Sequence, residues 1–156
     1  MSGFTIVNVD AAHTLGLELE AKTWLTEDFE LQGSIGLLRS KIDKYASSPD
    51  NKGNHLSSAP EANLGLGFTQ YVGDRWSFGA DVTYVSEYYS NLSNARRDMA
   101  GDYVVSNARF QYETGDITID GFIKNLTDED VLYYRADSLA AVGQDRSVGI
   151  SITYRM

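Results

Sequence analysis

The sequence predicts an all-β protein, an antiparallel up-and-down meander of about seven long strands that is part of a transmembrane β-barrel. Three observations predict it: apolar and polar residues alternate in long runs, short and long connections alternate between the runs, and the last run reaches the end of the chain. From 147 to 156 every even position is apolar or aromatic and every odd one is small, polar or charged. This is the period of a strand with one apolar face.

The composition excludes several other classes of protein. No window contains the ~18 to 20 consecutive apolar residues that a membrane-spanning helix needs. A formal net charge of −9, with scattered Lys and Arg, argues against nucleic-acid binding, which needs a basic stripe. The chain has no Cys, which removes disulfides and zinc-thiolate sites. The polar mean hydropathy of the chain remains compatible with a transmembrane barrel, because half of the residues of each strand face a wet lumen.

The first expected strand covers 4–25, with apolar residues at odd positions from Val7 to Leu19. The six others are expected at approximately 29–45, 60–72, 76–90, 102–113, 116–126 and 146–156. Soluble strands usually end after ~5 or 6 residues, whereas a tilted membrane strand needs ~9 to 11. The lengths therefore favour a membrane barrel.

The connections assign the two ends of this barrel. Those at 26–28, 73–75 and 114–115 are tight, whereas 46–59, 91–101 and 127–145 are long and rich in small and polar residues. Outer-membrane barrels place short turns in the periplasm and long loops outside, so we expect a periplasmic C-terminus. Aromatic residues near the short turns should form a lipid-facing girdle: Phe29, Trp76, Tyr112 and Tyr154, with Tyr84 and Tyr88 near the other end.

Polar residues on the opposite phase of the strands are expected to line the lumen, where they would contact a plug or a substrate. The principal candidates are Glu18, Glu20, Lys22, Asp81, Asn107, Arg109, Asp120 and Lys124, and the same phase includes Glu30, Gln32, Glu87, Gln111 and Arg155.

The apolar phase on either side of each short turn predicts which residues face each other. The phase flips across 114–115, so a two-residue loop closed by Glu113 and Asp116 is expected, and it does not flip across 26–28 and 73–75, so three-residue loops are expected there. The expected pairs are Tyr112 with Ile117, Phe110 with Ile119, Arg109 with Asp120, Leu25 with Phe29, and Val72 with Trp76.

Residues that could perform chemistry are few. His13 lies on the apolar phase of the first strand and His55 in a polar loop, and neither has a recognisable catalytic partner. The acidic run 128–130 lacks the alternating spacing and Gly of a calcium loop. We therefore expect no catalytic residue, no metal and no cofactor, and hence no enzyme.

Five sequence runs resemble the C-terminal part of a TonB-dependent receptor. They are 8–20, 59–64, 103–109, the Lys124-Asn125-Leu126-Thr127-Asp128 run and the terminal strand, in the order of that family and over essentially the whole chain. One departure is Met156, where such proteins usually end with an aromatic residue that the barrel-assembly machinery reads. The resemblance implies a larger barrel closed by an N-terminal plug with a TonB-contacting segment. We expect this chain, 1–156, to contain neither, and to be a fragment.

The resemblance implies a receptor for active uptake of a scarce nutrient, such as an iron chelate, cobalamin or an oligosaccharide. Its partners would be outer-membrane lipid, the remainder of the barrel and the plug, and TonB only through a segment outside this chain; nucleic acid is not expected. Two alternatives stay open. One is an autonomous eight-stranded outer-membrane barrel with an adhesive or structural role, which requires the first strand to split near Asp10. The other is a soluble lipocalin-like barrel with its apolar face inward.

Overall fold

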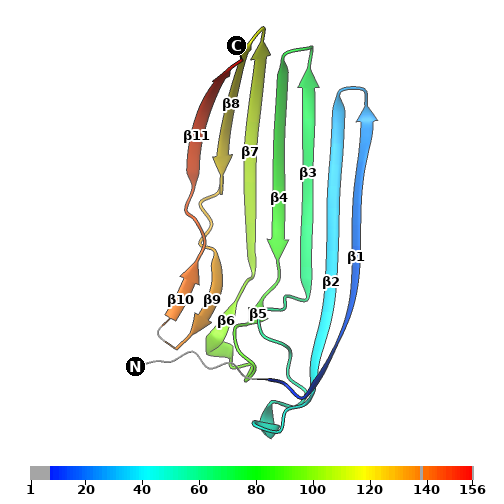
Figure 1. Ribbon diagram of the computed structural model, residues 1–156, viewed down its shortest axis with the longest axis vertical. Helices are drawn as coiled ribbons and strands as arrows, with labels where there is room; N and C mark the ends of the chain where they lie inside the picture. Colours follow the sequence, from blue (N-terminus) through cyan, green and yellow to red (C-terminus); the bar gives the residue numbers. More distant parts are fainter. Residues whose placement is uncertain (1–7, 138, 156) are drawn as a thin grey trace.

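A computed structural model describes residues 8–137 and 139–155, which form one twisted antiparallel sheet with a layer of loops at one end (Figure 1). The sheet has seven strands in the order β1-β2-β3-β4-β7-β8-β11, so each strand pairs with the next long strand in the sequence. The strands are β1 (Ala11–Thr26), β2 (Phe29–Lys44), β3 (Ala62–Val72), β4 (Trp76–Val85), β7 (Tyr103–Thr114), β8 (Ile117–Lys124) and β11 (Ser147–Tyr154). The predicted seven-stranded meander is confirmed.

Some strand ends differ from those expected. The first strand begins at Ala11, and residues 8–10 before it are not in a strand. The expected portion 4–7 and the terminal Met156 fall outside the described residues. The fourth strand ends at Val85 rather than at residue 90. Its last pair is with Tyr103, and the residues before Tyr103, Gly101 and Asp102, have positive φ of 84° and 55°, which is not a strand conformation. Within the described residues β1 and β11 are the two edges of the sheet, and they do not pair with each other. A closed eight-stranded barrel would require its first and last strands to pair.

The connections expected as plain loops contain short elements. Two short strands, β5 (Tyr88–Tyr89) and β6 (Met99–Ala100), pair in one of them, and β9 (Leu132–Ala136) and β10 (Leu139–Val142) form a hairpin in another. Two 3-10 turns, η1 (Pro49–Asn51) and η2 (Arg96–Asp98), complete this layer. The sequence placed Tyr88 in the fourth strand, and this was wrong: it lies in β5, within the loop layer.

The sheet has one apolar and one polar face, because side chains alternate along each strand. A single cross-strand row shows the apolar face: Leu19, Ile35, Leu64, Tyr84 and Val104 face one another in turn across five strands. This face is exposed in the isolated chain, with Leu19 at 59%. The buried hydrophobic residues of the described part are Ile42, Tyr45, Ala100 and Val131, which lie toward the loop end. Among the described residues no helix is long and apolar enough to cross a membrane.

The register between β7 and β8 differs by two residues from the expected one. Thr114 pairs with Ile117, so the two-residue loop is 115–116 rather than 114–115. Gly115 then occupies the first loop position with a φ of 56°, where a type II′ hairpin turn requires glycine. Tyr112 consequently faces Ile119 and not Ile117. A shift of two residues leaves every side chain on its expected face.

The turn between β1 and β2 also differs from the prediction. Leu25 does not face Phe29; Thr26 does, and a β-bulge at Leu25 interrupts the register. The bulge absorbs one residue, so a two-residue loop can join two strands whose apolar phase does not flip. Within this turn the Asp28 amide donates a hydrogen bond to Thr26 Oγ1 at 3.3 Å.

The turn between β3 and β4 is the one expected. Val72 faces Trp76 across the three-residue loop 73–75. Gly73 has a φ of 58°, which a side chain would disfavour.

Candidate functional site

The polar face of the sheet is the largest candidate site. Cross-strand pairing places Lys22, Gln32, Gly67, Asp81 and Asn107 in one row across five strands. All eight principal candidates from the sequence lie on this face, which is opposite to the apolar one: Glu18, Glu20, Lys22, Asp81, Asn107, Arg109, Asp120 and Lys124.

Arg109 lies at the centre of a hydrogen-bonded group on this face. Its guanidinium donates to Asp81 Oδ1 at 3.3 Å and to Thr69 Oγ1 at 3.1 Å. Asn107 Nδ2 donates to the other carboxylate oxygen of Asp81 at 2.6 Å. The guanidinium crosses Gly79, where an added Cβ would lie 2.7 Å from Arg109 Cζ. Because Gly79 has no side chain, the Arg109 guanidinium has room to lie flat against the sheet.

The expected pair between Arg109 and Asp120 is absent from this group. With the register shifted by two residues, Arg109 faces Phe122 and Asp120 faces Gln111. Gln111 Nε2 donates to Asp120 Oδ1 at 2.8 Å. The partner residues Thr69 and Gln111 could not be assigned without the register of both neighbouring strands.

A second ion pair joins the first two strands. Lys22 Nζ lies 2.9 Å from Glu30 Oε1, and the Glu30 side chain is only 10% exposed. A carboxylate this buried requires a compensating charge, and Lys22 supplies it.

Between these charged groups the polar face has a hollow of about 470 Å³. Gly65 and Gly67 form part of its lining, and the side chains of Ser34 and Gln32 lie over them, within 2.5 and 3.0 Å of where a Cβ would be. Lys22, Glu20 and Asp81 also line it, so the hollow presents charges of both signs. Among the described residues no group of three or more His, Cys, Asp or Glu could hold a metal ion.

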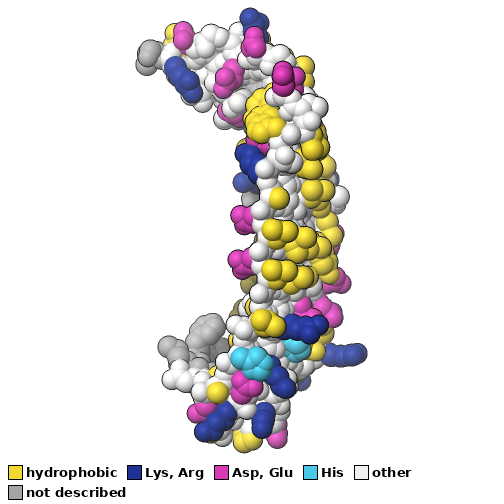
Figure 2. Space-filling model, turned by 90° about the vertical axis from the view of Figure 1, so that its right-hand side faces the viewer, with side chains coloured by type: hydrophobic (Ala, Val, Ile, Leu, Met, Phe, Trp, Pro, Cys, Tyr) yellow, Lys and Arg dark blue, Asp and Glu magenta, His cyan; other side chains and the backbone are white. Residues whose placement is uncertain are grey.

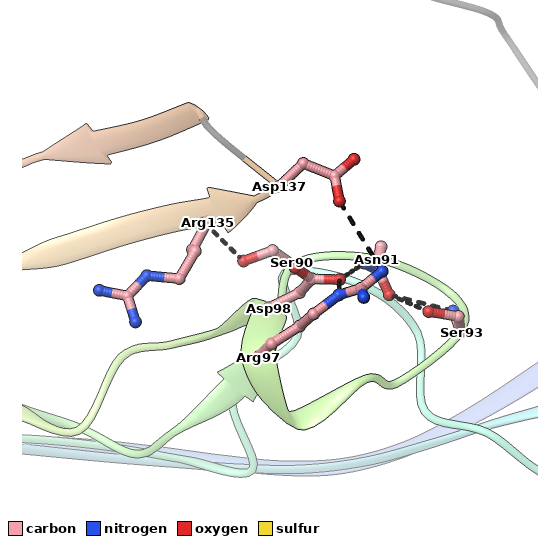
Figure 3. Close-up of polar contacts among 7 residues, drawn as sticks. All are labelled: Ser90, Asn91, Ser93, Arg97, Asp98, Arg135 and Asp137. Carbon is pink, nitrogen blue, oxygen red and sulfur yellow. Dashed lines mark hydrogen bonds and ion pairs between the residues drawn. The ribbon is translucent and has the colours of Figure 1, made fainter.

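The loop layer contains a second candidate, a polar cluster that joins the β5–β6 loop to the β9–β10 hairpin (Figure 3). Its centre is Asp98, whose side chain is 5% exposed and accepts a hydrogen bond from Asn91 Nδ2. Arg97 bridges the two segments, with Nε 3.8 Å from Asp98 and Nη2 3.7 Å from Asp137. The Arg135 backbone amide donates to Ser90 Oγ at 2.9 Å, and Asn91 Oδ1 also accepts from the amide and hydroxyl of Ser93.

A tyrosine contact makes another link in this layer. The Tyr88 hydroxyl donates to the backbone carbonyl of Tyr133 at 2.8 Å. Burial, and then the neighbouring Tyr133 phenol, raise the pKa of Tyr88 above its ordinary value.

Asn125, in the 124–128 run, anchors the segment that leads to β9 and β11. It is 4% exposed and has a φ of 51°. Its Nδ2 donates to the carbonyls of Glu129 at 2.9 Å and Gln144 at 3.2 Å, and its Oδ1 accepts from the Glu129 amide at 2.8 Å. Asn107 Oδ1 in turn accepts the Asn125 backbone amide at 3.1 Å. This contact links the polar face to the loop layer.

The expected girdle residues lie on the apolar face near the short turns. Trp76 packs against Tyr112 with ring centroids 4.4 Å apart, Phe29 stacks on Phe68 at 5.6 Å, and Tyr154 faces Ile117. The two histidines have acidic neighbours: His13 Nδ1 lies 2.7 Å from Asp43, and His55 Nδ1 lies 3.6 Å from Glu61.

Sequence reasoning missed the order in the loop layer. Long polar connections are ordinarily irregular, yet Leu132 to Ala136 contain two consecutive tyrosines, a strand-favouring signal that pointed to β9. No local signal identifies Asp98 as buried, because its burial comes from segments distant in the sequence.

The sheet, with its exposed apolar face and its charged opposite face, has the architecture of a segment of a membrane β-barrel wall. A family model described as TonB dependent receptor-like, beta-barrel, matches residues 1–126. The chain belongs to this family, whose members are outer-membrane proteins.

Solved structures of such receptors have the same fold over 92% of this chain. They include the siderophore receptor PiuA from Acinetobacter baumannii (19% identity, TM-score 0.82), the ferric yersiniabactin uptake receptor FyuA from Yersinia pestis (22%, 0.80) and the ferric preacinetobactin receptor BauA from A. baumannii (20%, 0.78). The matched region is 22%, 23% and 22% of those chains, respectively, so this chain spans less than a quarter of their length.

Proposed function

We propose that this chain is the C-terminal part of the barrel wall of an outer-membrane receptor that takes up a scarce nutrient. The carrying observation is the continuous apolar face, which stays exposed across seven strands in the isolated chain. The family supports a TonB-coupled transport cycle for the whole receptor, and the similar solved structures favour an iron chelate as its ligand. The remaining barrel strands, the plug and the segment that contacts TonB lie outside this chain in this proposal.

The wall is oriented with the loop layer outside the cell and the short turns and the C-terminus in the periplasm. The polar face lines the lumen, so its eight candidates from Glu18 to Lys124 contact the plug or the passing ligand. Phe29, Trp76, Tyr112 and Tyr154 lie in the periplasmic-side girdle against lipid. The support for this orientation is that the short turns and the long loops segregate to opposite ends of the sheet (Figure 1).

In this function the chain contributes structure and ligand contacts, and not energy coupling. By itself it neither binds TonB nor translocates ligand. Uptake of a ferric chelate by vesicles that carry only this chain would contradict the proposal.

Two neighbouring substitutions of opposite orientation test the lipid-facing assignment. Leu19 lies midway along the apolar side of β1, where Leu19→Lys should disfavour insertion by about 2–4 kcal/mol. Glu20 is the next residue and points to the polar face, so Glu20→Lys should insert as well as the wild type. Protease protection in phosphatidylcholine vesicles and heat-modifiable migration measure insertion. Equal insertion of the two variants would contradict a lipid-facing apolar side.

A further inference from the structure

Basic residues lie on the apolar face at the loop end of β1 and β2. Arg39 faces Leu15, and Lys41 faces His13, in the cross-strand register. Both follow Ile35 and Leu37 at intervals of two along β2, so their side chains leave the sheet on the side that the leucines occupy. The apolar stripe thus ends in two exposed cations rather than in the loop layer.

The depth of these cations corresponds to a membrane surface. Arg39 is ten residues beyond Phe29, which begins β2 at the short turn. At ~3.3 Å per residue and a tilt of ~40°, this separation is ~25 Å along the membrane normal. The apolar band of an outer-membrane barrel is ~25 Å tall. Lys41 lies two residues further toward the loop end of β2. Arg39 and Lys41 therefore reach the level of the lipid headgroups when Phe29 lies at the opposite interface.

Arg39 and Lys41 carry positive charge in a chain whose net charge is −9. Among the described residues, neither Arg39 nor Lys41 has an acidic side chain within 4.0 Å, whereas the nearby Asp43 is bound to His13 at 2.7 Å. Figure 2 shows Lys, Arg and His side chains, with acidic ones among them, directly beyond the lower end of the hydrophobic belt. The two cations are thus available to an external anion at the point where lipid contact ends.

We propose that Arg39 and Lys41 bind the phosphate of a phosphorylated glycolipid in the outer leaflet, while Leu15 and Leu37 contact its acyl chains. The guanidinium of Arg39 offers a planar pair of donors that suits a phosphate, and Lys41 adds a second point charge. This inference rests on the proposed membrane function, because it needs the apolar side of β1 and β2 to face lipid.

The test measures the affinity of the detergent-folded chain for diphosphoryl lipid A by titration in mixed micelles with native mass spectrometry. Each basic residue near an anionic membrane surface contributes a factor of about five. The Arg39→Gln and Lys41→Gln double variant should therefore bind about 25-fold more weakly. The matched control is Arg75→Gln with Arg96→Gln, which loses the same charge at the short turn and in the loop layer and should bind as the wild type does. Asp43→Asn, which removes the negative charge two residues beyond Lys41 in β2 and neither base, should bind more tightly.

Two further arms identify the source of the anion. Dephosphorylated lipid A should bind the wild type as weakly as the double variant binds the diphosphoryl form, and inorganic phosphate alone should not compete at comparable concentration. Equal affinity of the wild type and the double variant, or no preference for the phosphorylated lipid, would overturn the inference. Insertion into phosphatidylcholine vesicles would still stand in that case, so the proposed function would survive. A chain that does not insert into phosphatidylcholine vesicles would overturn both.

Discussion

Replacement of Asn125 should release the segment between β8 and β11 while leaving the sheet intact. Its side chain makes three hydrogen bonds, to Glu129 twice and to Gln144 once, and almost no part of it reaches solvent. Asn125 also holds a left-handed backbone conformation, which asparagine tolerates better than alanine does. Asn125→Ala therefore removes the bonds and strains the backbone.

The size of the effect follows from these two contributions. Three hydrogen bonds at about 0.5–1.5 kcal/mol each, and about 1 kcal/mol for alanine in the left-handed region, give about 2.5–5.5 kcal/mol. Asn125→Gly loses the same bonds without the backbone cost, so it should be about 1 kcal/mol less destabilising than Asn125→Ala. Asn125→Asp keeps the acceptor for the Glu129 amide, but it places a buried carboxylate oxygen against the carbonyls of Glu129 and Gln144, so its effect should be at least as large as that of alanine.

Amide hydrogen exchange in detergent measures this local opening. The Glu129 and Gly143 amides should exchange about 100-fold or more faster in Asn125→Ala, because the Gly143 amide is bonded to Val131 within the same segment. Amides of β3 and β4 should be unchanged, and Asn63→Ala, at an exposed asparagine of β3, is the control. Uniform acceleration across the sheet, or none at Glu129, would refute the reasoning.

Two further substitutions test contacts within the sheet. Gly121→Ala should destabilise the folded chain by about 1–3 kcal/mol in urea unfolding, because the added Cβ would lie 2.2 Å from Phe110 Cε1. Phe110→Ala in the same chain should recover part of the loss. An unchanged unfolding midpoint for Gly121→Ala would show that the ring does not lie over Gly121. Asp81→Asn should lower the free energy of unfolding by only about 0.2–1 kcal/mol, because the side chains of Arg109 and Asp81 are 48% and 31% exposed. The difference from the wild type should shrink in about 1 M salt. A larger or salt-independent loss would mean that water does not reach the pair.

The two faces of the sheet followed directly from the sequence. Alternation places Arg109 and Asp120 on one face and Phe110 on the other, and the register error did not change this. Pairing was harder to predict because a turn can move by two residues, or contain a bulge as at Leu25, without altering the alternation of side chains. Thr69 reaches Arg109 because the β3–β4 register pairs it with Gly79 and the β4–β7 register pairs Gly79 with Arg109. The local sequence specifies neither register.

The sequence by itself determined the strand order, the two faces and the ends of the sheet that carry short and long connections, because each depends on local alternation and on turn residues. The tertiary structure decided what the loop layer is. Asp98 becomes buried, and Ser90 accepts the amide of Arg135, 45 residues away, only when segments distant in the sequence come together. Such contacts depend on the distance that the folded strands impose between loop ends, and no period along the chain encodes that distance.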